Sequence, residues 1–178
     1  MERKILMIIA QKDFRDEEFR EPKAILEKEG IKVTVASTAT GTAKGMFGMQ
    51  VIPDVAIDKA NPAEFDAVVV VGGSGSQTYL WNNLQVHKIV QSLHQHGGLV
   101  AAICISPVVL AKAGLLEGKK VTVFRTATTL NELKKVGALI SDAPVVVDGR
   151  IITGKGPEAA GEFGQKIAES VVKLHPQK

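Results

Sequence analysis

The 178-residue sequence is short of cysteine, aromatic residues and long apolar runs, and each shortage excludes a class of protein. Its single cysteine, Cys104, cannot form an internal disulfide, so we expect a reducing, cytoplasmic setting. Aromatic residues make up only 4% of the chain and are not interleaved with Arg and Lys, which disfavours a base-stacking surface. No apolar run approaches the ~18 residues of a membrane span, and no signal-peptide pattern is present. We therefore expect neither nucleic acid nor a membrane as a partner.

Charged and metal-binding side chains are scattered along the chain. The formal net charge is +3, and the densest basic pairs, at 119–120 and 134–135, are typical of solvated loops and helix faces. The four histidines have no metal-ligand spacing and none adjoins Cys104, so we interpret all four as surface residues. The sequence thus predicts no metal site and no cofactor.

Apolar runs with the character of buried strands alternate with segments of helical spacing. We expect strands at 5–9, 32–37, 66–71, 99–103 and 120–124, and helices at 16–30, 77–96, 107–113, 129–135 and 157–174. Residues 38–52 are expected to form a loop or small hairpin, and 145–153 a hairpin that turns at Asp-Gly. Pro22 indicates that the first helix either starts there or is kinked. This alternation predicts one α/β domain over 1–178, with a mostly parallel sheet and helices on both faces.

The run from Leu99 to Ala111 has the pattern of a strand that turns sharply into a helix at Cys104. Ala101, Ala102 and Ser106 near the cysteine are small, and Pro107, which suits the first turn of a helix, follows three residues after it. Such a nucleophile elbow presents its side chain at the carboxyl ends of the strands. A lone cysteine in an apolar run is more often a core residue, but this turn favours a functional thiol. We expect the helix N-terminus to lower the pKa of Cys104.

Two further segments follow strands and so end at the same edge of the sheet. The run Gly-Gly-Ser-Gly at 72–75 lacks the dinucleotide and phosphate-loop patterns, and its simplest interpretation is a tight turn. Its position would also bring the backbone N–H groups of Gly73 and Ser74 towards the thiolate, as an oxyanion hole. Acidic residues between Asp13 and Glu21 are mostly explained as favourable charge near a helix N-terminus. One carboxyl among them, held beside a thiolate, would stay protonated and donate a hydrogen bond to sulfur.

These segments resemble the DJ-one/ThiJ/PfpI superfamily, which has a class I glutamine amidotransferase-like fold, in order and over essentially the whole chain. The similar blocks are 14–22, 65–73, 99–122 and 152–157. The resemblance implies a flavodoxin-like three-layer sandwich with Cys104 as the reactive residue. It also implies that a protonated Glu18 contacts the sulfur, that Gly73 and Ser74 supply the oxyanion hole, and that the chain forms a homodimer or a larger homo-oligomer.

The residue after the cysteine departs from the pattern of the superfamily's intracellular proteases, which carry a histidine there. Ile105 cannot accept a proton, so a Cys-His dyad is disfavoured. We expect Ile105 and Ser106 to be neighbours of the pocket. Arg15 stands at the earlier acidic position of the superfamily's acidic segment. An apolar residue after the cysteine resembles the branch linked to methylglyoxal handling, oxidation sensing and chaperone activity.

The leading hypothesis is a stress-protection enzyme whose Cys104 thiolate adds to a small aldehyde or a glycated substrate, as in a glyoxalase or deglycase. The alternative is a redox-sensing or chaperone-like protein that responds through oxidation of Cys104. A PfpI-type cysteine peptidase ranks third, because its histidine would have to come from another segment or subunit.

Overall fold

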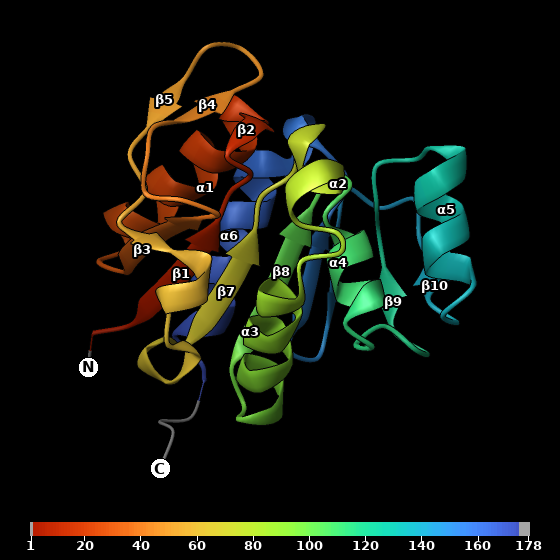
Figure 1. Cartoon of the computed structure of the whole chain (residues 1–178). Helices are drawn as coiled ribbons and strands as arrows, with labels where there is room; N and C mark the ends of the chain where they lie inside the picture. The colour runs from red at the N-terminus through yellow and green to blue at the C-terminus, as the bar shows by residue number, and fades with distance from the viewer. Residues whose placement is uncertain (1, 175–178) are drawn as a thin grey trace.

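A seven-stranded sheet forms the centre of the molecule in a computed structural model that describes residues 2–174 (Figure 1). In spatial order its strands are β11 (Val145–Asp148), β12 (Ile151–Gly154), β8 (Leu99–Ile103), β7 (Ala67–Val70), β1 (Lys4–Ile8), β3 (Lys32–Ser37) and β6 (Val55–Ala56). Neighbouring strands are parallel, except for the antiparallel hairpin of β11 and β12. Because the strands are parallel, their carboxyl ends meet at one edge, which is the upper edge in Figure 1.

Six α-helices connect or follow these strands in the described part of the chain. They are α1 (Asp16–Lys28), α2 (Gly75–Tyr79), α3 (Leu84–Gln95), α4 (Pro107–Lys112), α5 (Ala127–Lys134) and α6 (Ala160–Val171). Short 3-10 turns cover η1 (Ile57–Lys59), η2 (Pro62–Glu64) and η3 (Pro157–Ala159). Two small sheets complete the fold: β2 (Lys12–Phe14) with β4 (Ala43–Gly45) and β5 (Gln50–Val51), and β9 (Lys120–Val121) with β10 (Leu139–Ile140).

The central sheet is buried on both faces, and strand β1 shows why. Alternate side chains of a strand point to opposite faces, so Ile5 and Met7 join a core with α1 and α6, whereas Leu6 and Ile8 join a core with α3 and α4. Figure 1 shows α1 and α6 behind the sheet and α3 and α4 in front of it. The prediction of a flavodoxin-like three-layer sandwich with a mostly parallel sheet is confirmed.

Several element boundaries differ from the prediction. Helix α1 already begins at Asp16 and continues through Pro22, so the proline does not start it. The predicted helix over 77–96 is two helices, and the second starts at the cap Asn83, whose side-chain oxygen accepts from the Gln85 and Val86 N–H groups. The strand expected over 120–124 is only two residues long.

Two turns agree with the sequence. The hairpin over 145–153 forms as predicted, and its Gly149 has a φ of 60°, a left-handed value that glycine adopts without strain. The segment 38–52 contains the antiparallel pair of β4 and β5, which projects above α1 in Figure 1. No helix among residues 2–174 combines the length and the apolar character that crossing a bilayer requires.

Candidate active site

Strand β8 ends in a sharp turn that has Cys104 at its apex. Cys104 has a φ of 65°, in the left-handed region that residues with a Cβ rarely adopt, so the turn is strained. The N–H of Cys104 donates to the Gly154 carbonyl at 2.9 Å, and its own carbonyl accepts from the Phe124 N–H at 2.8 Å. The chain reverses direction directly after Cys104, because the Ser106 N–H donates to the Ile103 carbonyl and α4 begins at Pro107. The chain therefore has the strand–turn–helix geometry of a nucleophile elbow.

Ser106 holds the elbow against the neighbouring glycine turn. Its hydroxyl is fully buried and donates to the Val71 carbonyl at 2.7 Å, so it accepts from the Ser76 hydroxyl, also at 2.7 Å. Ser106 was expected as a neighbour of the pocket, and it is not among the residues that line it. The hydroxyl of Ser106 is engaged in these two hydrogen bonds and stabilises the turn.

Gly72 packs against both the Cys104 side chain and the Glu18 carboxyl. A Cβ on Gly72 would lie 2.4 Å from the Cys104 Cβ and 2.4 Å from Glu18 Oε1, so only glycine fits against the pair. Glu18 is 0% exposed and Cys104 is 8% exposed. The structure thus brings together the thiol and the carboxyl that the sequence analysis paired, one from the elbow and one from the first turn of α1.

Burial controls the protonation of this pair. Desolvation raises the pKa of Glu18 to about 8, although its contact with Cys104 and the charge of Arg15 act in the opposite direction. Both carboxyl oxygens of Glu18 are buried and make no hydrogen bond of good geometry within residues 2–174. A buried, unsatisfied carboxyl is far more stable in its neutral form, so Glu18 is protonated at neutral pH.

The pKa of Cys104 is also raised, chiefly by burial and then by the charge that Glu18 carries when ionised. The predicted lowering by the helix N-terminus is wrong, because desolvation outweighs the backbone N–H groups of Gly73 and Ile105 that stabilise the thiolate. Gly73 has a φ of 102° and its Cα packs against the Arg15 main chain, so the turn that brings its N–H to the sulfur requires glycine. Ile105 N–H is thus a donor that the sequence analysis missed, while Ser74 lines the pocket.

A pocket of about 410 Å³ opens over the thiol, large enough for a small metabolite. Residues from six separate segments line it: Arg15, Met46, Gly73, Ser74, Gln77, Trp81, Cys104, Ile105, Phe124, Thr126, Thr128, Thr129 and Pro157. Ile105 lines the pocket as expected. Trp81 donates its Nε1–H to the Ile105 carbonyl at 3.0 Å and so fixes the wall beside the thiol. Trp81, Phe124 and the three threonines come from loops and helix starts, where no sequence pattern marked them.

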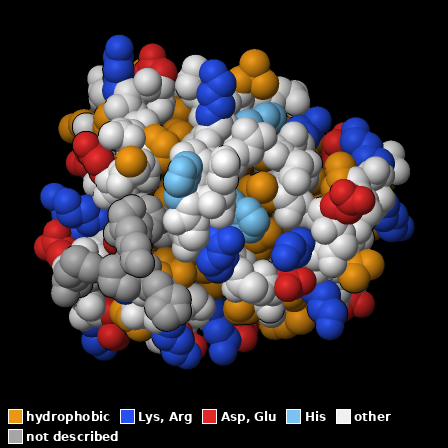
Figure 2. Space-filling view, turned by 90° about the horizontal axis from the view of Figure 1, so that it is seen from below, with side chains coloured by type: hydrophobic (Ala, Val, Ile, Leu, Met, Phe, Trp, Pro, Cys, Tyr) orange, Lys and Arg blue, Asp and Glu red, His pale blue; other side chains and the backbone are white. Residues whose placement is uncertain are grey.

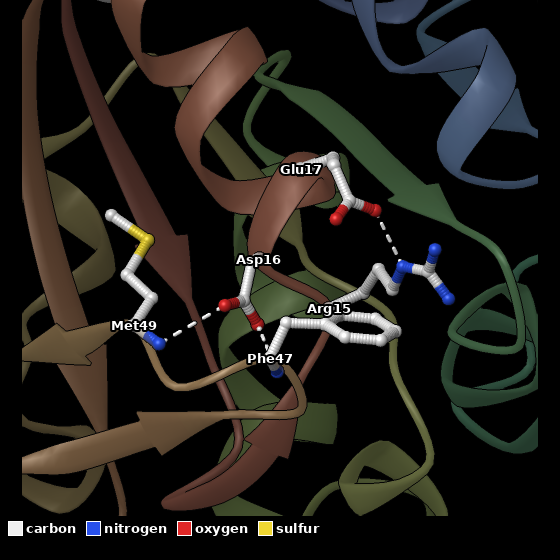
Figure 3. Close-up of polar contacts among 5 residues, drawn as sticks. All are labelled: Arg15, Asp16, Glu17, Phe47 and Met49. Carbon is white, nitrogen blue, oxygen red and sulfur yellow. Dashed lines mark hydrogen bonds and ion pairs between the residues drawn. The ribbon is translucent and has the colours of Figure 1, made fainter.

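The first turn of α1 also holds the hairpin of β4 and β5 at the rim of the pocket (Figure 3). Asp16 is buried, and its carboxylate accepts from the N–H groups of Phe47 and Met49 at 3.1 and 3.0 Å. Arg15 pairs through Nε with Glu17 at 2.5 Å, and its guanidinium carbon lies 4.5 Å from the centre of the Phe47 ring. Of this acidic segment, the sequence analysis proposed a role at the site for Glu18 alone.

No histidine is among the described residues that line the pocket. Histidine side chains are visible from the opposite side, among interspersed acidic and basic residues (Figure 2). His87 and His94 are half-buried, and His87 Nε2 lies 2.7 Å from the Trp81 carbonyl. His175 lies outside the described residues. Within 2–174, no three His, Cys, Asp or Glu side chains gather as a metal site would require.

The chain thus combines a mostly parallel α/β sandwich with a cysteine on a nucleophile elbow, a buried acid beside it and no histidine among the described lining residues of the pocket. The sequence model of the DJ-1/PfpI family matches residues 3–170, and the chain belongs to that family.

An uncharacterized protein of Methanocaldococcus jannaschii is 47% identical over 96% of this chain and 83% of its own length. A deglycase of Thermococcus kodakarensis is 36% identical over 85% of this chain and 90% of its own length. The crystal structure of a ThiJ/PfpI domain protein from Brachyspira murdochii superposes with a TM-score of 0.92 at 32% identity, covering 98% of this chain and 100% of that one.

Proposed function

We propose that this protein is a deglycase-like enzyme that converts small reactive carbonyl compounds through the Cys104 thiol. The observation that carries the proposal is the contact of Cys104 with the buried Glu18 at the floor of a 410 Å³ pocket. A relative that shares 36% of the aligned residues is named a deglycase, which supports the same class of substrate.

In the proposed first step, the Cys104 sulfur attacks the aldehyde carbon of an α-oxoaldehyde such as methylglyoxal. A carbon–sulfur bond forms, and the carbonyl electron pair moves to oxygen. Glu18 accepts the thiol proton on one oxygen and gives up the proton of the other, so the former carbonyl oxygen becomes a hydroxyl. The N–H groups of Gly73 and Ile105, which stabilise negative charge on sulfur, are placed to stabilise the oxygen as its charge develops.

The hemithioacetal formed in this step is the intermediate common to glyoxalase chemistry. A proton then shifts from the carbon that bears sulfur to the neighbouring carbonyl carbon. The hydroxyl proton passes to the ketone oxygen in the same rearrangement, so the hemithioacetal carbon becomes the thioester carbonyl and the ketone becomes an alcohol. Water hydrolyses the thioester to a hydroxy acid and regenerates the thiol. Glu18 is the acid and base within reach of the sulfur in the described residues, so we assign it the proton shift.

Consumption of methylglyoxal by purified protein tests the proposal. We expect activity in the wild type and a loss of about a hundredfold or more in Cys104→Ser and in Glu18→Gln. Glu21→Gln is the matched control for the acid, because Glu21 is exposed on the same helix. Equal rates in wild type and Cys104→Ser, or no activity in either protein, would contradict the proposal.

Two rival functions make different demands on the pocket. A peptidase needs an imidazole at the thiol, and the described lining residues include none. A redox sensor needs a thiol that is readily oxidised, and burial keeps the pKa of Cys104 high, which slows oxidation. Peptide cleavage that depends on Cys104, or sulfinate formation at Cys104 under mild peroxide without methylglyoxal turnover, would favour one of them.

A further inference from the structure

Arg15 is the only charged side chain among the described residues that line the pocket. The other polar side chains of the lining, on Ser74, Gln77 and the three threonines, are neutral hydrogen-bonding groups. An uncharged aldehyde does not need a cation at this place. The position of Arg15 therefore indicates a second recognition element in addition to the thiol and its acid.

Three contacts fix Arg15 at the rim. Its main-chain N–H donates to the Gly72 carbonyl at 3.0 Å, which ties it to the glycine that packs against Cys104 and Glu18. Its Nε donates to Glu17, and the Phe47 ring lies against its guanidinium at 4.5 Å (Figure 3). Because the main chain, the Nε and one face of the guanidinium of Arg15 are all held in place, the side chain loses little conformational entropy when it binds a ligand.

These contacts leave the outer edge of the guanidinium for a ligand. Among the described residues, neither terminal nitrogen of Arg15 donates a hydrogen bond to a protein group, since its one side-chain hydrogen bond uses Nε. The paired terminal N–H groups of arginine match the two oxygens of a carboxylate. Glu17 orients the side chain through the third nitrogen without blocking that edge.

We propose that Arg15 binds a carboxylate on the substrate, so that the preferred substrates are α-oxoaldehydes that carry an acid group. The inference rests on the proposed function and names its substrate class. The aldehyde would lie at Cys104 and the carboxylate at Arg15, at two places in one cavity of about 410 Å³, which suits a short-chain acid. The Glu17 carboxylate reduces the attraction by its own charge, so the selectivity comes mainly from bidentate geometry.

The test compares 4,5-dioxopentanoate, an α-oxoaldehyde with a carboxylate, with its uncharged methyl ester. We expect the wild type to have the higher kcat/KM for the acid. Arg15→Gln should reduce the ratio of the two kcat/KM values about tenfold or more, and Arg15→Lys should retain part of it, since the charge remains without the planar fork. Arg20→Gln, at an exposed position of the same helix, is the matched control and should leave both rates unchanged. An unchanged ratio in Arg15→Gln overturns the inference.

A binding measurement separates this inference from the proposed function. The compound 4-oxopentanoate has the carboxylate but no aldehyde, so its binding to the protein requires no turnover. Calorimetry should show weaker binding to Arg15→Gln than to wild type and Arg20→Gln. If the wild type consumes neither aldehyde but this difference is found, the proposed reaction fails and the anion site stands. If all three proteins bind it equally, or none binds it, the anion site is overturned whatever the kinetics show.

Discussion

The Glu18 carboxyl and the Cys104 side chain both lie against the Gly72 Cα, so close that a methyl group at Gly72 would overlap both. Both groups are buried, and an ionised Glu18 raises the energy of the Cys104 thiolate, whereas the contact with the neutral Cys104 thiol favours the Glu18 carboxylate. The pair therefore holds at most one negative charge near neutral pH. Glu18 is the group that ionises first, because burial raises its pKa to about 8 while the pKa of Cys104 lies higher.

Replacing Glu18 with glutamine should make the thiol more acidic. In the wild type, ionised Glu18 raises the pKa of Cys104, and glutamine cannot acquire that charge. The rate of alkylation by iodoacetamide rises with pH as the thiol ionises. We expect the midpoint of this rise to lie at a lower pH in Glu18→Gln than in the wild type. Glu21→Gln, whose side chain is exposed, should titrate as the wild type does. A midpoint that moves to higher pH in Glu18→Gln would mean that Glu18 stabilises the thiolate.

The buried carboxyl should also give the fold a pH-dependent stability. The pKa of Glu18 is about 8 in the folded state, against 4.5 for the unperturbed group, so the folded state binds this proton more tightly than the unfolded state does. The stabilisation of the fold by this bound proton is complete below about pH 4.5. It is lost as the pH rises towards 8, at up to about 1.4 kcal/mol per pH unit. Urea unfolding of wild type and Glu18→Gln across this range measures it. The stability of the wild type relative to the variant should fall with rising pH, and a constant difference would refute the assignment.

Gly72→Ala should damage both stability and thiol chemistry. Its Cβ would overlap the Cys104 Cβ and Glu18 Oε1, and would lie 2.8 Å from the Ile103 carbonyl oxygen, which is backbone and cannot move aside. We expect a loss of about 1–3 kcal/mol in the free energy of unfolding, together with slower alkylation of Cys104. Gly161→Ala is the control, because its Cβ would enter open space near the start of α6. That change should be neutral or stabilise the protein by up to about 1 kcal/mol.

Asp16 should anchor the hairpin at the rim. Asp16→Ala leaves the Phe47 and Met49 N–H groups without their acceptor and should cost about 2–4 kcal/mol of stability. Asp16→Asn keeps one carbonyl oxygen and should cost less. Amide hydrogen exchange at 47 and 49 should accelerate in both variants, measured against Asp58→Ala, an exposed aspartate. Unchanged exchange at these two amides would show that other contacts hold the hairpin.

The order of elements and the place of the thiol could be predicted because their signals are local. Strand β8 has the predicted bounds, 99–103, since a short apolar run followed by small residues and a proline has few other folds available. The break between α2 and α3 has a local signal in Asn83, a residue favoured at helix starts, but the helical spacing on both sides concealed it.

The pocket wall could not be predicted in the same way, because its residues come from segments far apart in the chain. Nothing local distinguishes Phe124 or Thr128 from other loop residues, and only the folded structure brings them near Cys104. The prediction of a lowered pKa for the Cys104 thiol was wrong for a related reason. The helix N-terminus that lowers the pKa can be recognised in the sequence, but the burial that raises it depends on the whole fold. The homo-oligomer that the resemblance implies stays a prediction, as does the single domain over 1–178.

Four consecutive residues at the start of α1 do four different things. Arg15 faces the pocket, Asp16 binds the hairpin, Glu17 orients Arg15, and Glu18 reaches the sulfur. Asp16, Glu17 and Glu18 are successive helical residues and point about 100° apart, while Arg15 precedes them as the extended N-cap residue, so each of these directions is available to one residue only. Deleting or inserting a single residue just before this turn would move each of these side chains to the direction that its neighbour now occupies. The segment therefore acts as a block, tolerant of substitution at each position to a different degree but intolerant of any change in length.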